Sequence, residues 1–236
     1  MKNGKKIGLV LAASGIGKRM NSEKSKQLIE IDSKPILLHS LNSFLHEGSV
    51  DECVITVNES IMTEVKNLTH SLKSDKKIEV VLGGSERQDS VYQGLKYFKQ
   101  NPPHIALVHD AVRPFVGPDL ISRVIDSAIE FGSAIPAIKL KDTIKRTDDG
   151  KVFSETPDRN LYRLIQTPQG FNFELLLNAY DDAFDSGFYG TDDASLVEKY
   201  GTEPFIVDGD ERNIKITTPY DLQFAQIIIK DFNYLI

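Results

Sequence analysis

The strongest constraint on the fold is a series of five short apolar runs, separated from one another by longer segments. The runs are Ile7–Ala12, Cys53–Val57, Ile78–Leu82, Ile105–His109 and Ala134–Ile138. Nearly continuous apolar runs of this length are typical of strands that are buried on both faces of a sheet. Because helical patterns lie between them, the sequence predicts a Rossmann-like α/β fold, with a mostly parallel sheet and helices on both faces.

Helical signals occur at three places between and after these runs. Ile36–His46 repeats apolar residues at helical spacing. Ser85 and Gln88 fit a capping box, which predicts a helix from there to about Lys99. Thr218-Pro219 fits an N-cap followed by proline at the first helical position, which predicts a C-terminal helix.

One segment breaks the alternation of strands and helices. Thr143–Thr147 and Lys151–Thr156 flank Asp148-Asp149-Gly150, a pattern that predicts a hairpin with an Asp-Gly turn. The segment is rich in charge, so we expect an arm at about residues 142–165 that protrudes from a single domain spanning residues 1–236. A two-stranded ribbon is marginally stable alone, so the arm is expected to pack against a second subunit.

Charge and cysteine content exclude several classes of protein. The 236 residues include 28 Lys and Arg against 34 Asp and Glu, a formal net charge of -6, whereas a protein that coats nucleic acid is normally basic. One cysteine, Cys53, excludes a disulfide framework and a cysteine-rich zinc site, and its apolar neighbours predict a buried thiol. No run approaches the roughly 18 apolar residues of a membrane span, and we expect a cytoplasmic protein without a membrane partner.

The segment that follows the first run has the character of a phosphate-binding loop. Its small residues, Ala12–Gly15 and Gly17, would let backbone amides approach phosphate oxygens, and Lys18 and Arg19 add positive charge. Such a loop lies at the carboxyl edge of the sheet, where open α/β folds bind ligands. Met20 excludes a dinucleotide fingerprint, and Arg19 excludes a Walker A loop. A phosphate site of another kind is therefore predicted, and a simple strand-to-helix turn is the alternative.

Several blocks along the chain together resemble one enzyme family. They are Ala12–Met20 with Lys26-Gln27, Gly83–Val91, His109–Pro114, Asp142–Arg146, Asp158–Asn160, Gln166–Gln169, Thr191–Ser195 and Asn213–Lys215. The first block resembles the signature of sugar-phosphate nucleotidylyltransferases. In order and spacing, the whole set resembles the 2-C-methyl-D-erythritol 4-phosphate cytidylyltransferases of the non-mevalonate isoprenoid pathway. The resemblance extends from about Ile7 to Ala225.

The resemblance implies a reaction and its requirements. The CMP moiety of CTP would be transferred to 2-C-methyl-D-erythritol 4-phosphate, which gives 4-diphosphocytidyl-2-C-methyl-D-erythritol and pyrophosphate. The attacking phosphate is largely dianionic at neutral pH, because its second pKa is about 6, so no general base is obligatory. Fixed cations, and Mg²⁺ held mainly by the CTP phosphates, would stabilise the charge that moves to pyrophosphate. The family also implies a homodimer formed through the arm.

The family pattern assigns roles to matching residues of this chain. The catalytic cations are Arg19 and Lys26. The residues expected to bind CTP are Ala12, Ala13, Ser14, Gly15, Gly17, Lys18, Gly84, Ser85, Arg87, Ser90, Asp110 and Ala111. The residues expected to bind the polyol phosphate are Asp110, Arg113, Thr143, Arg159, Thr167, Thr191 and Lys215, with Asp110 also a candidate ligand of Mg²⁺. His109 is expected to be structural, because neighbouring residues on a strand point to opposite faces.

Two departures from the family pattern and two alternative functions accompany this hypothesis. Ser25 stands where the family usually has proline, and Ser14 where alanine or glycine is usual. One alternative is a ribitol 5-phosphate cytidylyltransferase, but that family typically lacks the block at Thr191–Glu198. The other is a non-catalytic nucleotide-binding regulator. The joint presence of five site residues argues against a regulator: Arg19, Lys26, Asp110, Arg113 and Lys215.

Overall fold

The computed structural model describes residues 1–15 and 25–232, the side chain of residue 232 excepted. The five predicted strands are confirmed, and every boundary agrees within one residue. They are β1 (Ile7–Ala13), β4 (Glu52–Val57), β5 (Lys77–Leu82), β6 (Ile105–Asp110) and β7 (Ser133–Lys139). Three further strands of the same sheet were not predicted: β8 (Arg163–Ile165), β9 (Gln169–Asn172) and β10 (Ile206–Asp208).

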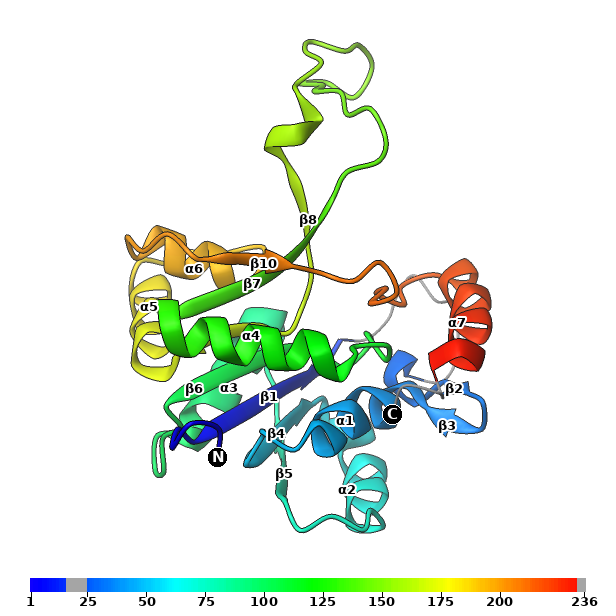
Figure 1. Ribbon diagram of the computed structural model, residues 1–236, viewed down its shortest axis with the longest axis vertical. Helices are drawn as coiled ribbons and strands as arrows, with labels where there is room; N and C mark the ends of the chain where they lie inside the picture. Colours follow the sequence, from blue (N-terminus) through cyan, green and yellow to red (C-terminus); the bar gives the residue numbers. More distant parts are fainter. Residues whose placement is uncertain (16–24, 233–236) are drawn as a thin grey trace.

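These strands form one mixed sheet of eight strands within the described residues (Figure 1). Its order is β10-β7-β9-β6-β1-β4-β5, with β8 paired to β7. Four pairings are parallel: β1 pairs with β4 and with β6, β4 pairs with β5, and β10 pairs with β7. β8 and β9 run in the opposite direction to the strands they pair with. The sheet is therefore mostly parallel, as predicted, and its parallel strands end at one common edge.

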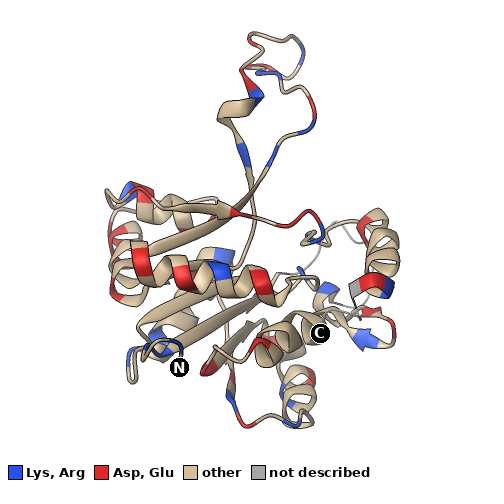
Figure 2. Ribbon diagram, viewed as in Figure 1, with Lys and Arg blue, Asp and Glu red and all other residues tan. Residues whose placement is uncertain are grey.

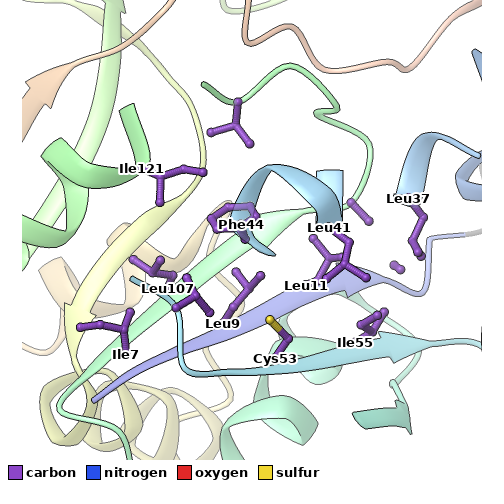
Figure 3. Close-up of a cluster of buried hydrophobic side chains, with 14 of the residues drawn as sticks. Ile7, Leu9, Leu11, Leu37, Leu41, Phe44, Cys53, Ile55, Leu107 and Ile121 are labelled. Carbon is purple, nitrogen blue, oxygen red and sulfur yellow. The ribbon is translucent and has the colours of Figure 1, made fainter. Parts of the chain in front are cut away.

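Helices cover both faces of the sheet. On one face lie α1 (Ile36–Glu47), α2 (Met62–His70) and α4 (Pro118–Phe131). On the other lie α3 (Arg87–Phe98), α5 (Phe173–Asp185) and α6 (Asp193–Lys199). Figure 3 shows Phe44 and Leu41 of α1 packed over Leu9 of β1 and the Cys53 thiol of β4. Cys53 is fully buried, as predicted, and burial raises its pKa to about 12.

A smaller unit packs beside the sheet edge that carries the site. Its hairpin, β2 (Glu30–Ile31) with β3 (Lys34–Pro35), packs against the helix α7 (Pro219–Phe232) (Figure 1). The predicted start of this helix is confirmed, because Thr218 Oγ1 accepts a hydrogen bond from the amide of Asp221 at 3.3 Å. Single 3-10 turns complete the described elements: η2 (Lys26–Leu28), η3 (Glu59–Ile61) and η4 (Arg159–Leu161).

The segment between β7 and β8 rises away from the sheet (Figure 1), but it is not the predicted regular hairpin. One isolated bridge joins Arg146 to Glu155, and the Asp149 carboxylate accepts hydrogen bonds from the amides of Lys151 and Val152. The residues around the bridge are exposed, so neither side of the ribbon has an apolar surface to pack on within this chain. Without that packing, the pairing does not extend beyond one bridge.

The start of α3 also differs from the prediction. The capping box is formed by Glu86 and Asp89, one residue later than expected, and the helix ends at Phe98. Asp89 Oδ2 accepts hydrogen bonds from the Glu86 amide at 3.0 Å and from Ser85 Oγ at 2.7 Å. The Ser85–Gln88 pair and the Glu86–Asp89 pair have the same spacing. An ionised carboxylate is the stronger acceptor, so the acidic pair forms the cap.

No helix in residues 1–15 or 25–232 combines the length and the apolar character that a bilayer crossing would need.

Candidate active site

Two neighbouring cavities open at the carboxyl edge of the sheet. The first has a volume of about 370 Å³ and lies at the ends of β1, β5 and β6. The second has a volume of about 490 Å³ and lies beyond the end of β6, toward β8 and the start of α6. In the described part of the chain, the residues that line both cavities are Arg87, Asp110 and Lys215. Two separate ligands could therefore meet at this shared wall.

Most of the residues predicted to bind the nucleotide line the first cavity. They are Ala12, Ser14, Gly15, Gly84, Ser85, Arg87, Ser90 and Asp110, and the predicted catalytic residue Lys26 lines the same cavity. Ala13 and Ala111 are buried behind it, where the Ala13 carbonyl accepts a hydrogen bond from Gln27 and the Ala111 amide donates one to Ala12. Gly17, Lys18 and Arg19 lie outside the described residues.

The residues predicted to bind the polyol phosphate divide into two groups. Asp110, Arg113, Thr167, Thr191 and Lys215 line the second cavity. Thr143 and Arg159 lie on the arm, where both are exposed, and neither lines either of these two cavities. The Arg159 guanidinium instead donates a hydrogen bond to the carbonyl of Lys141.

The shared wall belongs to a network of charged side chains from five elements or loops. Arg87 Nε donates to Asp110 Oδ1 at 2.9 Å, and Lys215 Nζ lies 2.8 Å from Asp110 Oδ2. Arg113 Nε lies 3.9 Å from the same Oδ2. The two terminal nitrogens of Arg87 donate to the two oxygens of Asp193 at 3.0 and 2.7 Å. Three cations thus surround two carboxylates, an excess of positive charge that suits anionic ligands.

The cations determine the ionisation of Asp110. Burial by itself would raise the pKa of this carboxyl, but Arg87, Lys215 and Arg113 together hold it well below its ordinary value. Burial lowers the pKa of Arg87, yet the carboxylates of Asp193 and Asp110 outweigh burial and raise it well above the usual range. At neutral pH Asp110 and Arg87 are therefore both charged.

Asp193 is a site residue that the sequence analysis missed. It is fully buried at the first position of α6, and besides Arg87 it accepts a hydrogen bond from the Tyr180 hydroxyl at 2.5 Å. Burial raises the pKa of Tyr180 well above its usual range, so this hydroxyl stays a donor. The block Thr191–Ser195, which carries the family resemblance, contains both Asp193 and the preceding Asp192. Asp192 is the N-cap of α6. Two adjacent aspartates therefore have different roles, which the sequence pattern did not separate.

His109 has the structural role that was predicted. It is fully buried, with Nε2 3.0 Å from the Arg113 carbonyl and Nδ1 3.0 Å from Thr167 Oγ1. The Asp110 amide donates to the same Thr167 hydroxyl at 3.1 Å. Burial lowers the pKa of His109 to about 4, so the ring is neutral at pH 7. His109 therefore holds the two segments that carry Arg113 and Thr167 side by side.

Gln27 is a second residue whose role the sequence did not reveal, although Lys26-Gln27 is part of the family resemblance. Its side chain is buried, and its amide nitrogen donates to the carbonyls of Ala13 and Gly15, at 2.7 Å in both cases. The side chain therefore fixes the backbone at the end of β1, directly beside the η2 turn that carries Lys26.

The residues present do not fit a metal ion that is resident in the protein. Residues 1–15 and 25–232 contain no group of three or more acidic, imidazole or thiol side chains arranged to hold a metal. Both oxygens of Asp110 are already bonded to cations, Arg87 on one side and Lys215 on the other. Binding of Mg²⁺ by Asp110 stays a prediction.

The fold and the paired cavities define a nucleotide-binding α/β protein with room for a second anionic substrate at the same sheet edge. The family model for 2-C-methyl-D-erythritol 4-phosphate cytidylyltransferase matches residues 7–231. The chain belongs to this family.

Relatives and solved structures agree with this assignment. The chain is 43% identical over 218 residues to the 2-C-methyl-D-erythritol 4-phosphate cytidylyltransferase of Bacillus cytotoxicus, which covers 92% of this chain and 95% of that protein. It is similar to the structure of 4-diphosphocytidyl-2C-methyl-D-erythritol synthase from Anaerococcus prevotii, with a TM-score of 0.85, 32% identity and 97% of each chain covered. The Thermus thermophilus cytidylyltransferase gives a TM-score of 0.78 at 27% identity, over 95% of this chain and 99% of that chain.

Proposed function

We propose that this protein transfers the CMP moiety of CTP to 2-C-methyl-D-erythritol 4-phosphate and releases pyrophosphate, a step in non-mevalonate isoprenoid precursor synthesis. One observation carries the proposal beyond family membership: two cavities share the wall formed by Arg87, Asp110 and Lys215. A transferase for two phosphate-bearing substrates needs the attacking oxygen and the α-phosphorus at one place, and a shared cationic wall provides it.

The residues act by position and charge. The polyol phosphate occupies the second cavity, where Arg113 and Lys215 neutralise its charge. CTP occupies the first cavity with its phosphates near Lys26, and its α-phosphate meets the attacking oxygen beside Lys215. One phosphate oxygen forms a bond to the α-phosphorus while the bond to pyrophosphate breaks. Asp110 receives no proton, because its surrounding cations keep it ionised; it holds the cations in place.

Mg²⁺ enters this proposal with the nucleotide. Mg²⁺ usually keeps several waters and binds substrate phosphates, whose charge it neutralises. Because the described side chains offer no resident metal site, a chelator should abolish turnover and leave the melting temperature of the nucleotide-free protein unchanged. A fall of that melting temperature in EDTA would contradict the assignment.

We further propose a homodimer in which each arm reaches the partner's site. Apolar side chains on and beside the arm are exposed: Val152 at 67%, Phe153 at 73% and Leu161 at 81%. Acidic and basic residues are interspersed along the arm (Figure 2). Arg159 lies outside both cavities of its own chain, so a partner's second cavity is the place where it could bind phosphate.

Subunit mixing tests this dimer. Heterodimers of an Arg159→Ala chain with a Lys26→Ala chain contain one site with both residues intact, so part of the activity should return. Each homodimeric variant should be impaired, and failure of the mixture to recover any activity would contradict shared sites. The predicted cytoplasmic location is unaffected by this test and stays a prediction.

Pyrophosphate release with CTP and each polyol phosphate tests the reaction itself. Turnover should be fastest with 2-C-methyl-D-erythritol 4-phosphate, and Lys215→Ala should lower it by about 10²- to 10³-fold. The matched control is Lys141→Ala, because Lys141 forms an exposed ion pair with Glu211 away from both cavities. Faster turnover of ribitol 5-phosphate would favour that alternative substrate, and no turnover with either would favour a regulator.

A further inference from the structure

The loop that carries Lys215 has no regular structure of its own. Residues 209–218 connect β10 to α7 (Figure 1) and form neither a helix nor a strand. Backbone hydrogen bonds hold the loop at two places: the Gly209 amide donates to β7, and the Ile216 amide donates to the segment that follows β6, at 2.9 Å in both cases. Between these two places lies Lys215, whose Nζ is 2.8 Å from Asp110 Oδ2 at the shared wall. A further contact must therefore fix the middle of the loop.

The side-chain amide of Gln166 provides such a contact. Gln166 lies between β8 and β9 and is 4% exposed. Its Nε2 donates to the Asp210 carbonyl at 2.8 Å, and its Oε1 accepts from the Asp210 amide at 3.1 Å. The same Nε2 lies 3.4 Å from the Asn213 carbonyl. An amide side chain combines the donor and the acceptor that this arrangement needs, so one buried residue satisfies both backbone groups of Asp210.

Charged side chains contribute little to the position of this part of the loop. Lys141 and Glu211 form an ion pair, but both are exposed, and exposed pairs stabilise a structure only weakly. The ion pair between Asp210 and Arg212 joins two residues of the loop itself, so it does not connect the loop to the sheet. The buried hydrogen bonds of Gln166 make that connection.

The next contacts along the loop extend this connection to the cations of the site. Asn213 is fully buried, and its side-chain amide donates to the Thr167 carbonyl at 2.8 Å. The Asn213 carbonyl accepts from Arg113 Nη1, also at 2.8 Å. Lys215 follows Asn213 by two residues, so the segment that begins with Gln166 holds the backbone from which Lys215 extends.

We infer that Gln166 is a positioning residue for Lys215, a role that rests on the proposed function and deepens it. By holding the backbone of Asp210, Gln166 places the Lys215 ammonium group at the wall that both cavities share. Gln166 also lines the second cavity, but its Nε2 and Oε1 are both bonded to the loop, so it acts through Lys215. A misplacement of about 1 Å can lower a rate by about a hundredfold, so the loss of this support should be measurable.

A double-mutant cycle tests whether Gln166 acts through Lys215. Gln166→Met keeps the length of the side chain and removes its donor and acceptor; it is combined with Lys215→Ala, and pyrophosphate release is measured per folded protein, with the folded fraction taken from circular dichroism. With Lys215 present, Gln166→Met should lower kcat/KM by about tenfold or more. In the Lys215→Ala background it should lower kcat/KM by less than about twofold. Gly209→Ala is a second variant that should show the same dependence, because its Cβ would lie 2.5 Å from Gln166 Oε1.

Gln88→Met is the matched control. Gln88 is 6% exposed, and its side-chain amide also joins two backbone groups, since it donates to the Phe188 carbonyl at 3.0 Å and accepts from the Gly190 amide at 2.9 Å. Gln88 lines neither of the two cavities, so Gln88→Met should change the rate by the same factor with and without Lys215. An equal loss from Gln166→Met in both backgrounds would overturn the positioning role, because a general disturbance of the fold acts whether or not Lys215 is present.

Calorimetric binding of CTP repeats the cycle without turnover, since Lys215 also lines the first cavity. If the unaltered protein releases no pyrophosphate, but Gln166→Met weakens CTP binding only when Lys215 is present, the positioning role stands and the proposed reaction fails. If Gln166→Met weakens neither turnover nor CTP binding, or weakens both to the same extent without Lys215, the positioning role fails and the proposed reaction is judged by pyrophosphate release alone.

Discussion

The buried ion pair between Arg87 and Asp193 gives the sharpest test of the site. Asp193→Asn removes the charge that faces both terminal nitrogens of Arg87, and the remaining amide oxygen can still accept from Tyr180. Breaking a buried ion pair by removing one partner costs about 3–5 kcal/mol. The Arg87 side chain is 28% exposed and keeps Asp110 as a partner, so we expect the lower end, about 3 kcal/mol. Asp193→Ala should cost roughly 1 kcal/mol more, because Tyr180 then also loses its acceptor.

Urea unfolding measures this difference directly. At an m-value of about 3 kcal/mol/M, a loss of 3 kcal/mol lowers the midpoint by about 1 M. The control is Glu211→Gln, which breaks the ion pair with Lys141. The Lys141 side chain is 72% exposed and the Glu211 side chain 64%, so the loss should cost at most about 1 kcal/mol. The same variant of Asp193 should also raise the KM for the polyol phosphate, because Arg87 orients Asp110 in the second cavity. A loss for Asp193→Asn no larger than for the control would refute the reasoning.

Three further predictions concern acid and the glycine beside Ser14. The folded pKa of His109 is about 4 against an ordinary 6.5, so stability should fall by about 1.4 kcal/mol per pH unit as pH drops from 6.5 to 4, and His109→Gln should flatten this slope in urea titrations. Hydrogen bonds from Lys6, Lys77 and Tyr97 outweigh burial and lower the pKa of Glu52 from 4.5 to about 2. The contribution of ionised Glu52 to the stability of the fold is therefore complete above pH 4.5 and is lost as the pH falls from 4.5 to 2. Glu52→Gln should remove this pH dependence from urea titrations. Gly83→Ala would place a Cβ 2.0 Å from Ser14 Oγ and should weaken CTP binding at least about tenfold, whereas Gly117→Ala, with no atom within 4 Å, should leave it unchanged; equal effects of the two substitutions would contradict the close approach.

Local chemistry explains why much of the fold was predictable. A strand buried on both faces must be apolar along its length. The apolar runs of β1, β4, β5, β6 and β7 therefore predict these strands without any knowledge of which strands pair with them. The same holds for the start of α7, where Thr218 and Pro219 satisfy the helix end locally. In contrast, β9 reads Gln-Gly-Phe-Asn and has no strand pattern, and it is a strand because β6 and β7 bind its two edges.

The failures have the same physical cause. The hairpin predicted for the arm has suitable turn residues at Asp149 and Gly150, but a ribbon needs an apolar surface to pack on, and this chain alone provides none. The cap of α3 could form at either of two positions with identical spacing, and the stronger acceptor, the Asp89 carboxylate, decided between them.

The sequence by itself determined the five long strands, the helices α1, α3 and α7, the loop of small residues after β1, and most of the residues at the sheet edge. Those features depend on neighbours within a few positions along the chain. Tertiary structure alone decided that Arg87, Asp110, Asp193 and Lys215 form one network, that Asp193 rather than Asp192 is its buried carboxylate, and that the hydroxyl of Ser14 lies beside Gly83 without a partner. Ion pairing, burial and close approach act between groups that lie 23 to 106 residues apart in sequence and that only the folded sheet brings together.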